Sequence, residues 1–259
     1  AALIYLVSPL SLIDGALWGQ VDSLGVCIFL VAVVLALKRM PLLAGCIYML
    51  AMMTKLQNMI YGPVFFLFIW QTLGFRCLVQ AITGATVGFF GLNIEFVLTR
   101  NMDRVLASLT ENFDYFPWMS LNAYNLWWIV SGGRGMAVSD KLSVLGMLNA
   151  KVVGLVLFSG FYLFATLRQL FDPWVTPGKH HEGAGRNKTF LESLIIVNAA
   201  FFLFQSQSHD RYAFPLSVFL LLWAPFYLSV YTKSEALKAR VLLFILFYGV
   251  FTGFYFYNL

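Results

Sequence analysis

Long apolar runs separated by short polar or basic segments limit what this chain can fold into. Residues 15–37 and 77–98 are two such runs, and each is long enough to cross the roughly 30 Å hydrocarbon core of a bilayer as a helix. Of all residues, 60% are hydrophobic and 11% charged, whereas charged residues make up about 25% of soluble domains. The sequence therefore predicts an all-α, polytopic integral membrane protein.

The apolar runs predict about eight spans in a single transmembrane domain covering residues 1–259, which we expect to lack its natural N-terminal part. The expected spans are residues 15–37, two within 41–73, then 77–98, 142–167, 190–207, 213–231 and 241–258. Lysine and arginine gather at 38–39, at 76, and in the segments 168–189 and 233–240. Because basic loops tend to stay in the cytoplasm, we place the 168–189 loop and the 233–240 turn there, and the 99–141 loop outside.

A polar interruption, Thr54-Lys55-Leu56-Gln57-Asn58, divides the 41–73 run. We interpret it as the outer-side break between two shorter helices. The alternative is one long kinked helix, which would reverse the side of every later segment. In the outer loop, apolar residues recur at helical spacing from Met102 to Phe113, which predicts an amphipathic helix in the membrane interface.

An acidic residue, Asp22, opens the first apolar run, and a buried acid in a membrane marks a possible site. Asp14 is expected to cap a helix that begins near Gly15. Under the predicted topology, four polar motifs reach the same outer face. They are Trp18-Gly19-Gln20-Val21-Asp22, Lys55-Leu56-Gln57, the stretch from Asn122 to Trp128, and His209-Asp210-Arg211-Tyr212.

Together these four motifs resemble those of the polytopic GT-C glycosyltransferases. The similarity runs from about Leu12 to Pro215 and is greatest to bacterial and archaeal mannosyltransferase-like proteins related to the second mannosyltransferase of GPI-anchor assembly. Asp210 stands where the family pattern leads us to expect glutamate. The resemblance implies transfer of a hexose such as mannose, with inversion, from a polyprenyl-phosphate-sugar donor to a glycan, lipid or protein acceptor on the outer or luminal face.

The chemistry of such a transfer assigns roles to the motif residues. A carboxylate must remove the acceptor proton, and cations must stabilise the departing phosphate. Asp22 is the candidate base, although the resemblance also leads us to expect the base in an outer loop before Ala1. The expected phosphate partners are Lys55, His209 and Arg211. The expected sugar or acceptor contacts are Trp18, Gln20, Gln57, Asn122, Tyr124, Asn125, Trp127, Asp210 and Tyr212.

Other partners and cofactors are limited by the sequence. The chain has no glycine-rich phosphate loop and no extramembrane stretch long enough for a nucleotide-sugar domain. Its partners are expected to be membrane lipid, the lipid-linked donor and the acceptor, with no nucleic acid. A divalent cation near Asp22 is the one cofactor considered, and no metal site is predicted. The expected location is a bacterial or archaeal plasma membrane, or the endoplasmic reticulum.

Several structural interpretations remain beside the functional ones. Asp22 could pair with a buried cation such as Lys55 and only hold helices together, and Lys55 could extend to the interface. Trp127 and Trp128 could form an interfacial belt. The chain as a whole could instead be a transporter or flippase for a lipid-linked or polar substrate, or a noncatalytic subunit or fragment.

Overall fold

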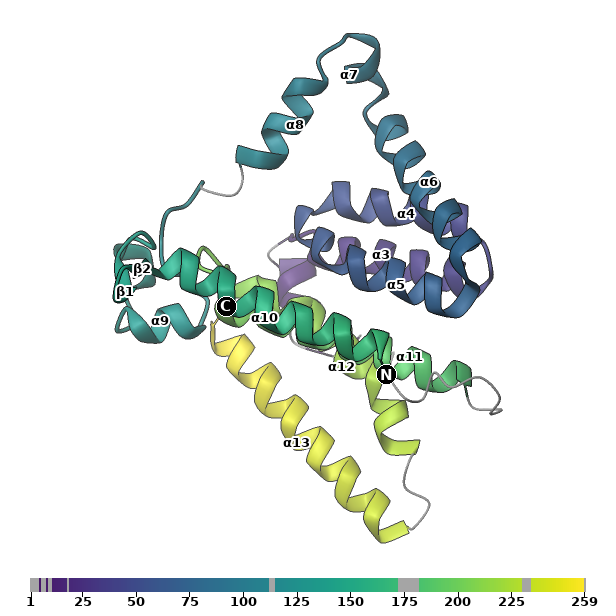
Figure 1. The fold of residues 1–259 in the computed structure, drawn as a ribbon. Coiled ribbons are helices and arrows are strands. Elements are labelled where there is room, and N and C mark those ends of the chain that lie inside the picture. The colour runs from purple at the N-terminus through teal and green to yellow at the C-terminus, as the bar shows by residue number, and fades with distance from the viewer. Residues whose placement is uncertain are drawn as a thin grey trace. The chain divides into compact units, whose positions relative to one another are not determined.

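The computed structural model describes residues 5, 8, 11–17, 19–111, 115–171, 182–229 and 234–258. These residues are mostly helical, with one short β-hairpin (Figure 1). The chain divides into two compact units. The first unit comprises Ala1–Ser23 with Trp118–Leu259, and the second unit comprises Leu24–Pro117. The all-α fold class predicted from the sequence is confirmed.

An aromatic cluster forms the core of the second unit. The elements of this unit are α3 (Asp22–Leu37, whose first two residues belong to the first unit), α4 (Pro41–Thr54), η2 (Leu56–Tyr61), α5 (Gly62–Leu73), α6 (Phe75–Leu92), α7 (Ile94–Leu98) and α8 (Met102–Glu111). The ring of Phe29 on α3 lies 6.2 Å from that of Tyr48, 5.0 Å from Tyr61 and 5.7 Å from Phe65. Three helices and the 3₁₀ turn η2 are thereby joined through one buried side chain.

The expected break within residues 41–73 is confirmed. Lys55 is extended, with φ −149° and ψ 116°, and separates α4 from η2. The buried side chain of Asn58 donates to the carbonyl oxygen of Ala51 at 2.8 Å, which also accepts from the Lys55 amide, so Asn58 adds a second donor at the end of α4. Tyr48 and Phe65, on opposite sides of the break, have ring centroids 5.5 Å apart. The two helices therefore fold back on each other, and a single long kinked helix is excluded.

Glycines allow α4 and α6 to pack backbone against backbone. A Cβ atom placed on Gly84 would lie 1.9 Å from the carbonyl oxygen of Leu42, and one on Gly45 would lie 1.9 Å from that of Ala81. No real side chain fits at such distances. Small residues at helix contacts are typical of membrane proteins, where van der Waals packing drives association.

Four helices dominate the first unit. Its elements are η1 (Leu12–Leu17), α9 (Leu126–Val130), η4 (Gly135–Ala137), β1 (Ser143–Leu145), β2 (Leu148–Asn149), α10 (Ala150–Leu170), α11 (Glu182–Phe204), η6 (Asp210–Ala213), α12 (Phe214–Ser229) and α13 (Ser234–Asn258). Helix α11 packs against both α10 and α12, and α13 packs against α12. Buried Ser193 of α11 donates to the carbonyl oxygen of Ala165 on α10 at 3.3 Å.

Among the described helices, five are long and apolar enough to cross a membrane. They are Phe75–Leu92, Ala150–Leu170, Gly185–Phe204, Asp210–Leu228 and Ala236–Tyr255. The count of about eight spans is not confirmed, because α3, α4 and α5 have 16, 14 and 12 residues. At about 1.5 Å per residue these helices are roughly 18 to 24 Å long, which is less than the hydrocarbon core of about 30 Å.

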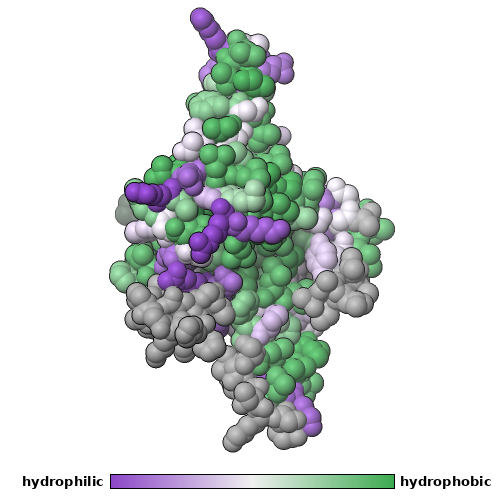
Figure 2. Space-filling model, turned by 90° about the vertical axis from the view of Figure 1, so that its right-hand side faces the viewer, coloured by the Kyte–Doolittle hydropathy of each residue, from purple (hydrophilic) through white to green (hydrophobic). Residues whose placement is uncertain are grey.

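The surface of these helices is consistent with a multi-pass integral membrane protein. Only 6% of the α13 span and 17% of the α10 span are buried inside the structure, although both are strongly apolar. Figure 2 shows hydrophobic residues over much of the visible face, with hydrophilic residues confined to patches. Exposed leucine, isoleucine and valine in such numbers are stable next to lipid and unfavourable next to water.

Several expected boundaries are corrected by the structure. The first helix begins at Asp22 rather than at residue 15, because Gly19 has a φ of +62° and turns the chain between η1 and α3. The prediction of a basic turn over residues 233–240 is also wrong, since α13 begins at Ser234. Helices α10 and α11 extend into the expected 168–189 loop, and residues 172–181 lie outside the described part. A helix is present from Met102 to Glu111, where the amphipathic helix is expected, and Phe113 also lies outside that part.

The glycine contact between α4 and α6 gives a stability prediction. Gly84→Ala should lower the free energy of unfolding by about 1–3 kcal/mol, because the added methyl group forces the two backbones apart. Gly91→Ala is the matched control on the same helix, since nothing lies within 4 Å of its Cβ position. Thermal unfolding of the detergent-solubilised variants, followed by circular dichroism, measures both. Equal midpoints for the two variants would contradict the close packing.

Candidate functional site

Two of the four polar motifs meet through their backbones in the first unit. Leu121 and Asn122 form β-bridges with His209, and the amide of Leu121 donates to the carbonyl oxygen of Ser208 at 2.9 Å. Asn122 adopts a left-handed conformation with φ 61°, which asparagine tolerates better than most residues. The loop that precedes α10 is thereby held against the turn that joins α11 to α12.

Asn125 and Trp127 strengthen this attachment from inside the loop. The Asn125 side chain accepts from the amides of Trp127 and Trp128 at 3.1 and 3.0 Å, and donates to the carbonyl oxygens of Phe202 and Gln205 at 3.2 Å each. These four bonds use both donors and both acceptor positions of the amide. Asn125 thus caps α9 and, at the same time, the open end of α11.

The ring of Trp127 is part of the core rather than of a surface. It is 1% exposed, packs with Met119 and Ala150, and its Nε1 donates to the carbonyl oxygen of Phe204. Stacking on a sugar needs an exposed ring face, which this placement does not offer. Tyr124 is exposed, and its ring lies 4.5 Å from that of Trp128.

Asp140, which lies outside the four sequence motifs, joins the same segments at a third point. Its carboxylate is fully buried and accepts from the Ser206 hydroxyl at 3.0 Å and from the Gln207 side-chain amide at 2.8 Å. Gln207 has a φ of 61°, so the turn after α11 is also conformationally unusual. The signal available in the sequence is weak, because Asp140 lies 66 residues before Ser206 and 67 before Gln207.

The first motif reaches the same unit through Asp22. Its carboxylate is 1% exposed, and Oδ2 lies 4.0 Å from Nε of Arg211. The Arg211 side chain is 26% exposed. Asp210 is also buried, and its Oδ1 accepts from the backbone amide of Arg211 at 2.7 Å. The structure therefore pairs the acid that opens α3 with the arginine that precedes α12, as an ion pair at the limit of contact distance.

Helix α13 also contributes to this pair, which the motifs did not indicate. The hydroxyl of buried Tyr255 donates to the carbonyl oxygen of Arg211 at 3.2 Å, and it lies within electrostatic range of Asp14, Asp22 and Asp210. Tyr212 packs its ring 5.2 Å from that of His209 and 5.7 Å from that of Phe201. Arg211 is thus held by contacts to its own turn, to the start of α3 and to the end of α13.

Asp14 does not cap a helix that begins near Gly15, as had been expected. It lies inside η1 and is fully buried, and its carbonyl oxygen accepts from the backbone amide of Gln20 at 3.0 Å. This bond closes the turn at Gly19, three residues before α3 begins. The Gln20 side chain is half-buried at the same turn, whereas Trp18 lies outside the described residues.

Lys55 and Gln57 belong to the second unit, where both lie at the break between α4 and α5. Lys55 is half-buried and ends α4, and Gln57 is buried in η2. A Cβ on Gly25 would lie 3.5 Å from that of Lys55, so this break packs against α3. Within the first unit the structure brings Asp22 to Arg211 and Asn122 to His209, which joins the other three motifs through these residues.

The chemistry that this cluster offers is recognition of an anion. An arginine guanidinium carries five N–H donors and can bind phosphate bidentately. Among the described residues, Nε of Arg211 is buried and has no hydrogen-bond partner, and Asp22 is its ion-pair partner at 4.0 Å. His209 and Tyr212 add a ring nitrogen and a hydroxyl nearby. No group of three or more His, Cys, Asp or Glu side chains in that part of the chain is placed to hold a metal ion.

The capping role of Asn125 can be tested directly. Asn125→Ala should lower the free energy of unfolding by about 2–4 kcal/mol, because it removes a helix cap and the donor to two partly buried carbonyl groups. Asn122→Gly is the control, since glycine keeps the left-handed backbone and the Asn122 side chain is exposed. Unfolding by denaturant titration of the purified protein measures both. Similar losses in the two variants would argue against a special role for Asn125.

Comparison with known proteins adds no relative for this chain. No family model matches it, and neither does any curated protein or solved structure. The resemblance to GT-C glycosyltransferases therefore depends on the four motifs alone.

Proposed function

We propose that the protein is a membrane glycosyltransferase that takes a sugar from a polyprenyl-phosphate carrier, and that Arg211 binds the carrier phosphate. The observation that carries this proposal is the exposure of the Arg211 side chain and the set of its contacts. Its side chain is partly exposed, its Nε has no hydrogen-bond partner among the described residues, and a buried carboxylate lies 4.0 Å away. The family resemblance of the surrounding motifs supplies the reaction class.

A lipid-linked phosphate fits this position better than a soluble anion does. Arg211 lies one residue inside the segment Asp210–Leu228, which is apolar enough to span a membrane. A ligand that binds Arg211 therefore lies between two environments. One is lipid, and the other is the polar loop before α10. A polyprenyl phosphate has an apolar tail for the first environment and a charged head for the second. Arginine is suited to the charged head because it binds phosphate in a planar, bidentate geometry.

Asp22 is proposed as a positioning residue that acts through Arg211. A carboxylate that is 1% exposed and lies beside a guanidinium is poorly placed to meet an acceptor hydroxyl. It is well placed to hold the guanidinium in one orientation and to balance its charge before the phosphate arrives. His209 is proposed to donate a proton or a hydrogen bond to the phosphate. Exposed Asn122 and Tyr124, with Gln20 and Tyr212, are the proposed sugar contacts.

The proposed reaction is a displacement at the anomeric carbon of the donor sugar. The acceptor hydroxyl oxygen forms a bond to this carbon while the bond from the carbon to the phosphate oxygen breaks. The electron pair leaves with the phosphate, where Arg211 stabilises it, and a carboxylate base removes the hydroxyl proton. The configuration at the anomeric carbon is inverted because the acceptor attacks opposite the departing phosphate.

The proposal predicts a specific loss of transfer. In membranes containing the protein, Arg211→Gln should lower sugar transfer from a labelled polyprenyl-phosphate sugar by at least about a hundredfold, as expected when a phosphate ligand that is strongest in the transition state is removed. Arg134→Gln, on an exposed loop residue of the same unit, is the control and should leave transfer unchanged. Size-exclusion profiles of the solubilised variants verify that they fold.

The positioning role of Asp22 needs its own measurement. Asp22→Asn should raise the KM for the lipid donor more than it lowers kcat, and Asp22→Glu should restore part of the loss. Transfer that is unchanged in both Arg211→Gln and Asp22→Asn would show that the pair is purely structural. Movement of the labelled donor across sealed vesicles without transfer to any acceptor would assign the protein to transport instead.

A further inference from the structure

A second polar centre lies at the opposite end of the first unit from Arg211. A groove with a volume of about 540 Å³ runs between α11, α12 and α13. Most of its wall is apolar and consists of Ile195, Ile196, Leu220, Leu243, Phe244 and Phe247. Its polar end is formed by Arg168, Glu192, Trp223 and Tyr227. None of these residues belongs to the candidate glycosyltransferase site.

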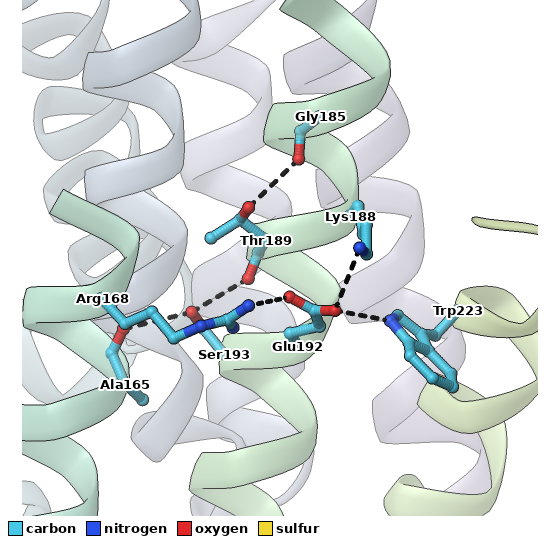
Figure 3. A network of polar contacts seen from close by, with 8 residues as sticks. All are labelled: Ala165, Arg168, Gly185, Lys188, Thr189, Glu192, Ser193 and Trp223. Atoms are coloured by element: carbon cyan, nitrogen blue, oxygen red, sulfur yellow. Dashed lines mark hydrogen bonds and ion pairs between the residues drawn. The ribbon is translucent and has the colours of Figure 1, made fainter. Parts of the chain in front are cut away.

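Glu192 organises the polar end of the groove. Its carboxylate pairs with the guanidinium of Arg168 on α10, accepts from Nε1 of Trp223 on α12 at 3.0 Å, and lies 3.8 Å from Nζ of Lys188 one turn earlier on α11 (Figure 3). Two cations therefore share one anion. The side chains of Arg168 and Lys188 are 38% and 37% exposed, whereas Glu192 is 16% exposed. The excess positive charge is thus the accessible part of the cluster.

A third cation comes from α13 at the same level. Arg240 donates from Nη1 to the hydroxyl of Tyr227 at 2.9 Å, and the Tyr227 ring stacks on Trp223 with centroids 4.8 Å apart. Tryptophan and tyrosine with basic neighbours are typical of the depth at which lipid headgroups meet the acyl chains. All these residues lie where α10 and α12 end and where α11 and α13 begin. The positive-inside tendency makes this the cytoplasmic end.

We propose that this groove binds one anionic glycerophospholipid of the cytoplasmic leaflet. Its acyl chains lie along the apolar wall, and its phosphate lies among Lys188, Arg168 and Arg240. In a membrane an apolar groove of this size is filled by lipid chains, because water gains no hydrogen bonds there. The headgroup is then selected by charge, because among the described side chains of the cluster three cations meet one carboxylate, which favours an anion. Basic pockets at this depth between spanning helices bind anionic lipids in general.

This lipid site is independent of the proposed reaction, so its test measures lipid retention alone. The solubilised protein is titrated with phosphatidylglycerol or phosphatidylcholine, and the bound lipid molecules are counted by native mass spectrometry. One phosphatidylglycerol should be retained at concentrations that leave no phosphatidylcholine bound. Lys188→Gln combined with Arg240→Gln should weaken this retention at least about tenfold, since each basic residue near a headgroup is worth roughly fivefold.

Two matched controls separate the groove from general charge and general hydrophobicity. Lys238→Gln removes an exposed cation from α13 that does not line this groove, and should leave retention nearly unchanged. Ile196→Trp should obstruct the groove and reduce retention, whereas Ile245→Trp, at a 58% exposed position on α13, should not.

Three outcomes would overturn the proposal. The first is equal retention of the two lipids, which would show that charge does not select the headgroup. The second is a loss of phosphatidylglycerol retention in Lys238→Gln as large as in the double variant, which would show that retention depends only on the net charge of the protein. The third is displacement of phosphatidylglycerol by an equimolar polyprenyl phosphate, which would assign the groove to the carrier lipid instead.

Discussion

The pairing of a buried acid with an arginine is the constraint on which the first unit depends. Asp22 begins α3, Arg211 precedes α12, and Tyr255 near the end of α13 bonds to the arginine backbone. Removing two charges from water is costly unless they meet each other in a suitable geometry. Three segments that are distant in sequence must therefore come together for either charge to be tolerated. The Arg211 side chain nevertheless stays 26% exposed.

Much of the fold follows from local sequence. The apolar runs predict helices, and the polar residues at Lys55 and Asn58 predict the break between α4 and α5. Helix ends were harder to predict, because a single backbone angle can end a helix. Gly19 shows this: its positive φ separates η1 from α3 within an apolar stretch that reads as one helix. The expected number of spans is not confirmed, because an apolar run in the sequence can hold helices too short to meet the length of a span, as α3, α4 and α5 do.

The candidate site was predictable as a set of motifs but not as a set of contacts. His209 and Asn122 stand out as polar residues in an apolar chain, and their backbones do meet. Asp140 and Tyr255 do not stand out, because their partners lie far away in sequence. Asn125 and Trp127 belong to a conspicuous motif, yet their polar groups are used to join α9 to the end of α11. A motif records which residues are close along the chain, and burial decides which of them remain accessible.

The separation of Asp22 from Arg211 along the chain also has a consequence in time. Roughly 190 residues are synthesised between the two, which takes about 10 to 40 seconds at 5–20 residues per second. During that interval Asp22 has been synthesised, but Arg211, with which it pairs, has not. Asp22 is the first residue of α3, and a carboxylate at a helix end can stay in the polar headgroup layer. It therefore need not enter the apolar part of the membrane before Arg211 is available to pair with it. Packing of the first unit is thus a late event, which begins only when the start of α12 has emerged.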